Sequence, residues 1–194
     1  MKPDRLNAFT DGVIAIIITI MVLEIRVPAS GGIEAIKPVL PIFGAYALSF
    51  VNVGIYWSNH HHMLQSARRV NGAVLWANLF LLFWLSLVPF VIRWVDEAGM
   101  TAWPVAAYGF VLIMAAVGYL LLERALIAAE GEDSRVGAAV GSRFKEWISF
   151  AGYAAGLLAA FFISPYVSIA LYVAVALTWL IPDRRFERQT DLQP

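Results

Sequence analysis

Long apolar runs, separated by short polar turns, follow one another along almost the whole chain. A helix needs ~20 mainly apolar residues to cross a bilayer core of ~30 Å, and several stretches approach this requirement. These stretches cover residues 7–27, 38–59, 72–92, 102–122, 145–163 and 166–181. The pattern therefore predicts an all-α, polytopic integral membrane protein with six transmembrane helices.

The segments between the expected spans contain residues that end helices. Proline and glycine follow the first span, and Ser164 with Pro165 forms a tight turn between the last two. The only long polar segment runs over residues 123–146. Because no internal repeat and no soluble domain is visible, we expect one transmembrane domain over residues 1–183 and a short polar tail over residues 184–194.

Composition supports a lipid environment. Of the 194 residues, 60% are hydrophobic and 14% are charged, whereas soluble domains are about 45–50% apolar and ~25% charged. The chain has no cysteine, which excludes disulfides, thiolate catalysis and cysteine-based zinc sites. Its formal net charge is zero, so bulk charge gives no reason to expect a nucleic-acid partner. The partner that the composition predicts is the lipid bilayer.

The basic residues indicate how the spans are oriented. If the N-terminus lies in the cytoplasm and six helices cross, eleven of the 14 lysines and arginines fall inside and three outside. The three outside are Arg26, Lys37 and Arg93. This asymmetry follows the positive-inside rule. We therefore expect a multi-pass protein of the cell membrane with both termini, and the polar tail, in the cytoplasm.

Four polar residues open the first span, and they are Arg5, Asn7, Thr10 and Asp11. A charged side chain at the centre of a membrane helix costs ~2.5–3.5 kcal/mol. The charged members must therefore lie near the cytoplasmic end or face other helices. One interpretation is purely structural: Thr10 or Asp11 caps the helix, and Arg5 extends to the bilayer surface.

The same segment resembles a known family. Residues 5–12 read R-L-N-A-F-T-D-G, which is similar to the R-x-x-x-F-S-D motif of the lysosomal potassium channel family, transmembrane protein 175, in its bacterial single-repeat form. Thr10 keeps the hydroxyl of the usual serine, and Glu24 stands where an aspartate is common. The likeness continues along the first span. Farther on, Tyr56-Trp57-Ser-Asn-His60-His61 resembles the family's aromatic and histidine cluster late in the second helix.

The resemblance implies a function and an assembly. It implies a cation channel that prefers potassium, in which four six-helix subunits surround one pore lined by their first helices. The family has no carbonyl filter, and this chain has no T-V-G-Y-G sequence either. We therefore expect a homotetrameric channel with potassium as the permeant ion and no cofactor. Its selectivity and gating would come from rings of side chains.

One face of the first span is the candidate pore lining. Ile16, Thr19, Ile20 and Leu23 are spaced so that they share this face. The resemblance places the pore constriction at Ile16, with Ile20 and Leu23 as further apolar gate rings. It makes Thr19 a ring of hydroxyls for selectivity. The residues alone do not choose this face, because the helix is apolar on all sides. The alternative is that the isoleucines only pack and that Thr19 bonds the carbonyl oxygen of Ala15.

Glu24 lies at the outer end of the first span. A ring of this carboxylate, one from each subunit, would attract cations to the outer side of a pore. The alternative is that Glu24 forms a local ion pair with Arg26 or Lys37. The sequence leaves both interpretations open.

Three adjacent histidines, His60, His61 and His62, invite a metal-site interpretation. Successive helical residues diverge by ~100°, so three neighbours cannot converge on one ion, and we expect no metal. The resemblance instead favours an anchoring role, with Trp57 beside His60 or His61. One of the histidines is expected to meet Arg5, Thr10 or Asp11 of the first helix, and Phe9 belongs to the same anchoring motif.

Polar and small residues inside the other spans predict helix contacts. Asn52 and Asn78 are expected to bond between helices, and Gly152-x-x-x-Gly156 is a spacing that lets another helix approach closely. None of these residues by itself indicates a ligand.

The rival function is a secondary or proton-coupled transporter. Such folds often contain internal repeats and broken helices, and the sequence predicts neither. An enzymatic activity is not expected, because no nucleophile motif, metal-ligand spacing or phosphate-binding loop is present in the chain.

Overall fold

The computed structural model describes residues 3–25, 27–28, 31–139 and 143–180, and within these ranges the chain is helical, without a strand. The prediction of an all-α fold is confirmed for these residues. Its α-helices are α1 (Pro3–Leu23), α2 (Leu40–Ser66), α3 (Gly72–Ser86), α4 (Val88–Ala98), α5 (Ala102–Glu130), α6 (Arg135–Ala139), α7 (Phe144–Phe162) and α8 (Pro165–Leu180). Short 3-10 helices, η1 (Ile33–Val39) and η2 (Gly131–Asp133), precede α2 and follow α5.

In the described part of the chain, four helical stretches are long and apolar enough to cross a membrane. They are Pro3–Leu23, Ile33–Ser66, Gly72–Ala98 and Ala102–Asp133. The other two expected spans correspond to α7 and α8, which have 19 and 16 residues. The end of the last expected span at residue 181, and the polar tail, lie outside the described residues. These stretches support a multi-pass membrane protein.

The third expected span contains an interruption. Leu87 separates α3 from α4 and has left the regular helical hydrogen-bond pattern. Pro89, in the first turn of α4, has no N–H to donate to the carbonyl oxygen of Leu85. The N–H of Leu87 bonds the carbonyl oxygen of Trp84 at 3.2 Å instead. The prediction that the chain contains no broken helix is therefore wrong at this position, because proline removes a hydrogen bond from the middle of the apolar run.

α1 begins earlier than its apolar pattern predicts. It starts at Pro3, a residue that suits the first turn of a helix because its missing N–H needs no partner there. Thr10 and Asp11 therefore lie about two turns inside the helix. The interpretation that one of them caps the helix is wrong.

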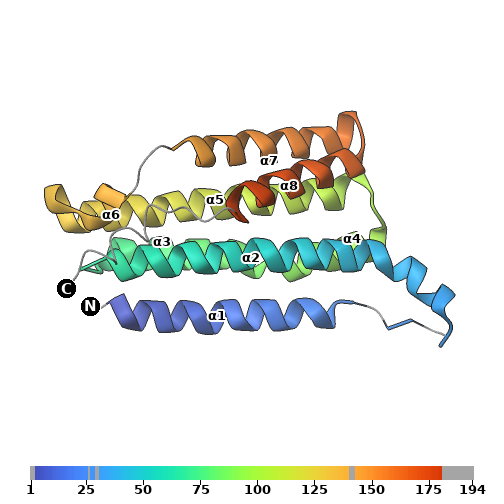
Figure 1. The fold of residues 1–194 in the computed structure, drawn as a ribbon, viewed down its shortest axis with the longest axis horizontal. Helices are drawn as coiled ribbons and strands as arrows, with labels where there is room; N and C mark the ends of the chain where they lie inside the picture. Colours follow the sequence, from blue (N-terminus) through green and yellow to red (C-terminus); the bar gives the residue numbers. More distant parts are fainter. Residues whose placement is uncertain (1–2, 26, 29–30, 140–142, 181–194) are drawn as a thin grey trace.

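The helices form a bundle with α1 at one edge and α7 at the opposite edge (Figure 1). α2 runs antiparallel beside α1, α3 packs on α5, and α7 packs on both α5 and α8. α1 also contacts α3 and α4. The C-terminal ends of α1 and α4 consequently lie at the same end of the bundle, and one side of α1 remains without a neighbouring helix among the described residues.

Close helix contacts depend on glycine. The ring of Tyr172 on α8 lies directly against Gly156 on α7 and Gly109 on α5, where a Cβ atom would collide with it. Tyr172 also donates a 3.3 Å hydrogen bond to the carbonyl oxygen of Val105. Gly152 meets Val175 in the same way. The close approach predicted from the Gly152-x-x-x-Gly156 spacing is confirmed.

Candidate functional site

α1 has two different sides. Its buried residues recur every three or four positions and are Leu6, Thr10, Ile14, Ile17 and Met21. The candidate pore residues lie on the other side: Ile16 is 58% exposed, Ile20 41% and Leu23 78%. A helix that is apolar all round thus buries one stripe and leaves the stripe that contains Ile16 uncovered within one subunit.

Thr19 lies on the uncovered side of α1 and is exposed. Its hydroxyl is within 3.0 Å of the carbonyl oxygen of Ala15 and 2.9 Å of that of Ile16. The backbone bond considered as an alternative for Thr19 is therefore present. A hydroxyl has one proton to donate and two lone pairs, so this bond leaves its oxygen able to accept or to coordinate a cation.

An open groove of about 410 Å³ runs along the uncovered side of α1. Ile16, Ile20 and Glu24 line it from α1. Phe90 and Arg93 line it from α4. The groove shows that the candidate pore face of α1 and one face of α4 look toward the same space.

The buried side of α1 is held by a chain of polar side chains. Asn78 on α3 donates through Nδ2 to the hydroxyl oxygen of Thr10 at 2.9 Å, and its Oδ1 lies 2.7 Å from Nε2 of His60 on α2. All three residues are at most 1% exposed. Since Asn78 Oδ1 can only accept, Nε2 of His60 carries the proton in this bond. Nδ1 of His60 is buried and has no hydrogen-bond partner within the described part of the chain.

A second set of contacts joins Asp11 on α1 to the late part of α2. The indole N–H of Trp57 donates to Oδ1 of Asp11 at 2.8 Å, and the Trp57 ring stacks on His61 with centroids 5.9 Å apart. Nδ2 of Asn7 lies 3.1 Å from Nδ1 of His61. Gln65 lies 2.8 Å from the other ring nitrogen of His61. These contacts place the polar opening of α1 against the aromatic and histidine cluster of α2.

The motif residues do not all face one way. Thr10 is buried between helices and Asp11 contacts Trp57, whereas Arg5 and Phe9 are exposed, Phe9 by 51%. His62 is exposed too. Among the described residues, no group of three or more metal-ligating side chains is close enough to hold an ion.

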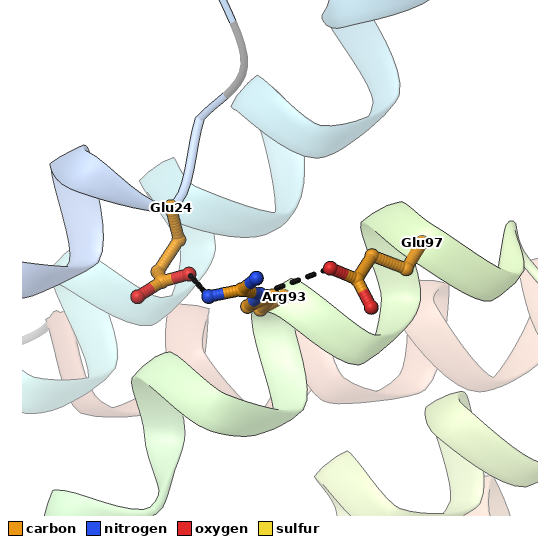
Figure 2. A network of polar contacts seen from close by, with 3 residues as sticks. All are labelled: Glu24, Arg93 and Glu97. Atoms are coloured by element: carbon orange, nitrogen blue, oxygen red, sulfur yellow. Dashed lines mark hydrogen bonds and ion pairs between the residues drawn. The ribbon is translucent and has the colours of Figure 1, made fainter.

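At the other end of α1, Glu24 meets α4 (Figure 2). Arg93 lies 3.6 Å from Glu24, the residue that follows α1, and 3.0 Å from Glu97 on its own helix, so its guanidinium bridges two carboxylates. Lys37, one of the partners considered for Glu24, pairs with Glu34 at 2.6 Å instead. The other, Arg26, lies outside the described residues.

Two residues are more important to this site than the sequence indicated. Asn78 was expected to bond between helices, and it does, but it is the centre that connects Thr10 to His60. The feature of the sequence that could have indicated this role is that Asn78 is a single amide in a strongly apolar run. Nothing in the sequence indicated that Arg93 pairs with Glu24, because the two residues are far apart in the chain. The sequence indicated only that Arg93 lies on the outer side of the membrane. Asn52 also bonds between helices, to the hydroxyl of Tyr108 at 3.4 Å.

Comparisons with known proteins agree with the resemblance noted in the first helix. A family model described as "Endosomal/lysosomal potassium channel TMEM175" matches residues 5–89, which include most of α1 and the whole of α2 and α3. A potassium channel of Chryseobacterium sp. (strain P1-3) is 52% identical over 188 residues, or 97% of each chain. The human endosomal/lysosomal proton channel TMEM175 is 34% identical over 86 residues, which are 38% of this chain and 17% of the human one.

A solved structure has the same fold. It is the crystal structure of a lysosomal potassium-selective channel TMEM175 homolog from Chamaesiphon minutus, with a TM-score of 0.74 and 24% sequence identity. The match covers 92% of this chain and 96% of that chain. The arrangement of helices described above is therefore shared along nearly the whole length of both proteins.

Proposed function

The chain belongs to the endosomal/lysosomal potassium channel family TMEM175, and from this membership we propose that it is a potassium-selective cation channel. The relative that is 52% identical along nearly its whole length is named a potassium channel. The observation that carries the proposal is the two-sided character of α1, which is anchored by polar bonds on one side and uncovered on the other. Potassium would pass down its gradient without coupling to another solute.

The proposed topology has six crossings with both termini in the cytoplasm. α1, α2, the α3–α4 pair, α5, α7 and α8 would each cross once. α8 rises ~24 Å over its 16 residues, which is short for a core of ~30 Å, so local thinning or flanking residues would complete this crossing. The excess of basic residues on the inside supports this orientation. The cell membrane is the proposed location.

Four subunits are proposed to meet around one axis, each contributing the uncovered side of α1. Rings of Ile16, Ile20 and Leu23 would then form apolar constrictions, which can gate by dewetting. Thr19 would provide a ring of hydroxyl oxygens that replaces part of the hydration shell of potassium. Copies of the same chain around the axis would cover these three apolar side chains, which are exposed by 41–78% within one subunit.

Anchoring of α1 is the proposed role of the motif and of the α2 cluster. Asp11 with Trp57, and Thr10 with Asn78 and His60, fix the rotation of α1 about its axis. Because these bonds lie opposite Ile16, they keep the same face directed away from the bundle. Arg5 and Phe9, which are exposed, are proposed to complete the cytoplasmic end of the pore or its subunit contacts.

The second candidate is a proton channel or a proton-coupled transporter. The human relative is named a proton channel, and the interruption at Leu87 lies beside the groove that α1 borders. Broken helices near a central site are common in transporters. A transporter would move potassium only together with protons, whereas a channel passes it down an electrical gradient alone.

Flux from liposomes tests the proposal. Liposomes that contain the purified protein and are loaded with potassium should release potassium when a membrane potential is set. The rate of release should not depend on a proton gradient. Ile16→Asn should raise the leak or lower the preference for potassium over sodium. Leu121→Asn, a matched substitution at an exposed position of α5, should leave the flux unchanged. If Ile16→Asn has no effect while the protein stays tetrameric, the pore assignment is wrong.

A further inference from the structure

Arg93 occupies a position between two carboxylates at the end of the bundle where α1 terminates (Figure 2). Glu24, from α1, is mostly covered, with 20% of its side chain exposed, whereas Arg93 is 60% exposed and Glu97 49%. The guanidinium therefore points into open space while it holds the carboxylate of α1. The three groups together carry one net negative charge.

The surroundings of Arg93 connect it to the candidate pore. It borders the groove that Ile16 and Ile20 line from α1. With Phe90 and Glu97 it also borders a second open groove of about 430 Å³, which shares Phe90 and Arg93 with the first. An ion that approaches the uncovered side of α1 from this end would meet Arg93 and Glu97 before it reached Ile20.

We propose that Arg93 is a conductance-determining residue, whose positive charge offsets Glu24 and limits the accumulation of cations at the outer mouth of the pore. This inference rests on the proposed channel function and revises the expected role of Glu24. The Glu24 ring would not act as a free ring of carboxylates. The attraction of cations by Glu24 at the mouth would be reduced by the positive charge of Arg93.

Elementary electrostatics predicts how large the effect of the Arg93 charge on cation concentration should be and how this effect should depend on salt. A unit charge ~10 Å away in water changes the local concentration of a monovalent cation about two-fold, and four subunits multiply this effect. The effect depends on salt, because the Debye length is ~30 Å at 0.01 M and ~3 Å at 1 M. A charge effect is therefore large in dilute potassium and nearly absent in concentrated potassium, whereas a purely mechanical role of Arg93 would show no such dependence.

The test is the single-channel potassium conductance in planar bilayers at 10 mM and at 1 M potassium chloride. Arg93→Gln should raise the conductance several-fold at 10 mM and change it little at 1 M. Arg93→Lys keeps the charge and should follow the unsubstituted protein at both concentrations. Glu97→Gln, which removes a carboxylate without touching α1, should lower the conductance at 10 mM.

The inference is overturned if the Arg93→Gln conductance is unchanged or lower at 10 mM. It is equally overturned if Arg93→Lys behaves like Arg93→Gln at both concentrations. If Arg93→Gln does not fold, Glu97→Gln tests the inference in its place. An unchanged conductance of Glu97→Gln at 10 mM would also overturn the inference. Failure of the channel function itself looks different, because then the unsubstituted protein carries no potassium current and Ile16→Asn has no effect on flux.

Discussion

Thr10 on α1 and Asn78 on α3 lie 68 positions apart in the chain, yet a 2.9 Å hydrogen bond joins them, and both side chains are 0% exposed. Asn78 uses its amide oxygen at the same time to bond His60 on α2. One amide thus connects three helices inside an apolar bundle. Buried polar groups of this kind are costly when a partner is removed, because no water replaces the lost bond.

Asn78→Leu should therefore destabilise the protein strongly. It leaves the Thr10 hydroxyl and Nε2–H of His60 without their partner, and each unsatisfied buried group costs ~1–3 kcal/mol. The melting temperature in detergent should fall well below that of Asn71→Ala, which removes an exposed amide that caps α3 and costs about 1 kcal/mol. Equal melting temperatures for the two variants would contradict the central role of Asn78.

Trp57→Phe tests the bond between α1 and α2. The substitution keeps an aromatic ring beside His61 but removes the indole N–H that donates to Asp11 at 2.8 Å. Since Trp57 is 44% exposed, the loss of stability should be modest, about 1 kcal/mol. The potassium flux should change as well, because α1 can rotate more freely. Trp76→Phe, on the exposed face of α3, is the matched control and should change neither quantity.

Gly156→Ala tests a close helix contact. A methyl group there would collide with the Tyr172 ring, and overpacking of this kind costs ~1–3 kcal/mol. Gly54→Ala is the control, because no atom lies within 4 Å of the added Cβ. Replacing a helical glycine by alanine in open space should stabilise by ~0.5–1 kcal/mol. Thermal unfolding should thus shift in opposite directions for the two variants.

Thr19→Val tests the proposed hydroxyl ring. Valine keeps the branched shape and removes the oxygen, so the ratio of potassium to sodium permeability should fall, whereas Thr19→Ser should retain it. The reversal potential between potassium and sodium solutions measures this ratio. Thr178→Val is the control, because Thr178 on α8 makes a similar 2.7 Å bond to the carbonyl oxygen of Val175. A Thr19→Val channel with unchanged selectivity would remove Thr19 from the filter.

Hydrophobic patterning along the chain determined the helices of this protein. A long apolar run in a membrane protein has to become a helix, since each backbone group finds its partner four residues away and needs none from lipid. Glycine spacing indicated, for a similarly local reason, that another helix approaches α7 closely. The interruption at Leu87 was within reach as well, because Pro89 cannot donate a hydrogen bond whatever the tertiary structure is.

The choice of faces and partners was decided only by the tertiary structure. α1 is apolar on every side, so its periodicity carries no direction, and the bonds of Thr10 and Asp11 to other helices select the side that turns inward. Glu24 has two basic residues nearby in the sequence, and among the described residues it forms an ion pair with Arg93 on α4. Local hydrogen bonds and the transfer of side chains from water set the elements, whereas a contact between distant residues depends on how all the helices pack.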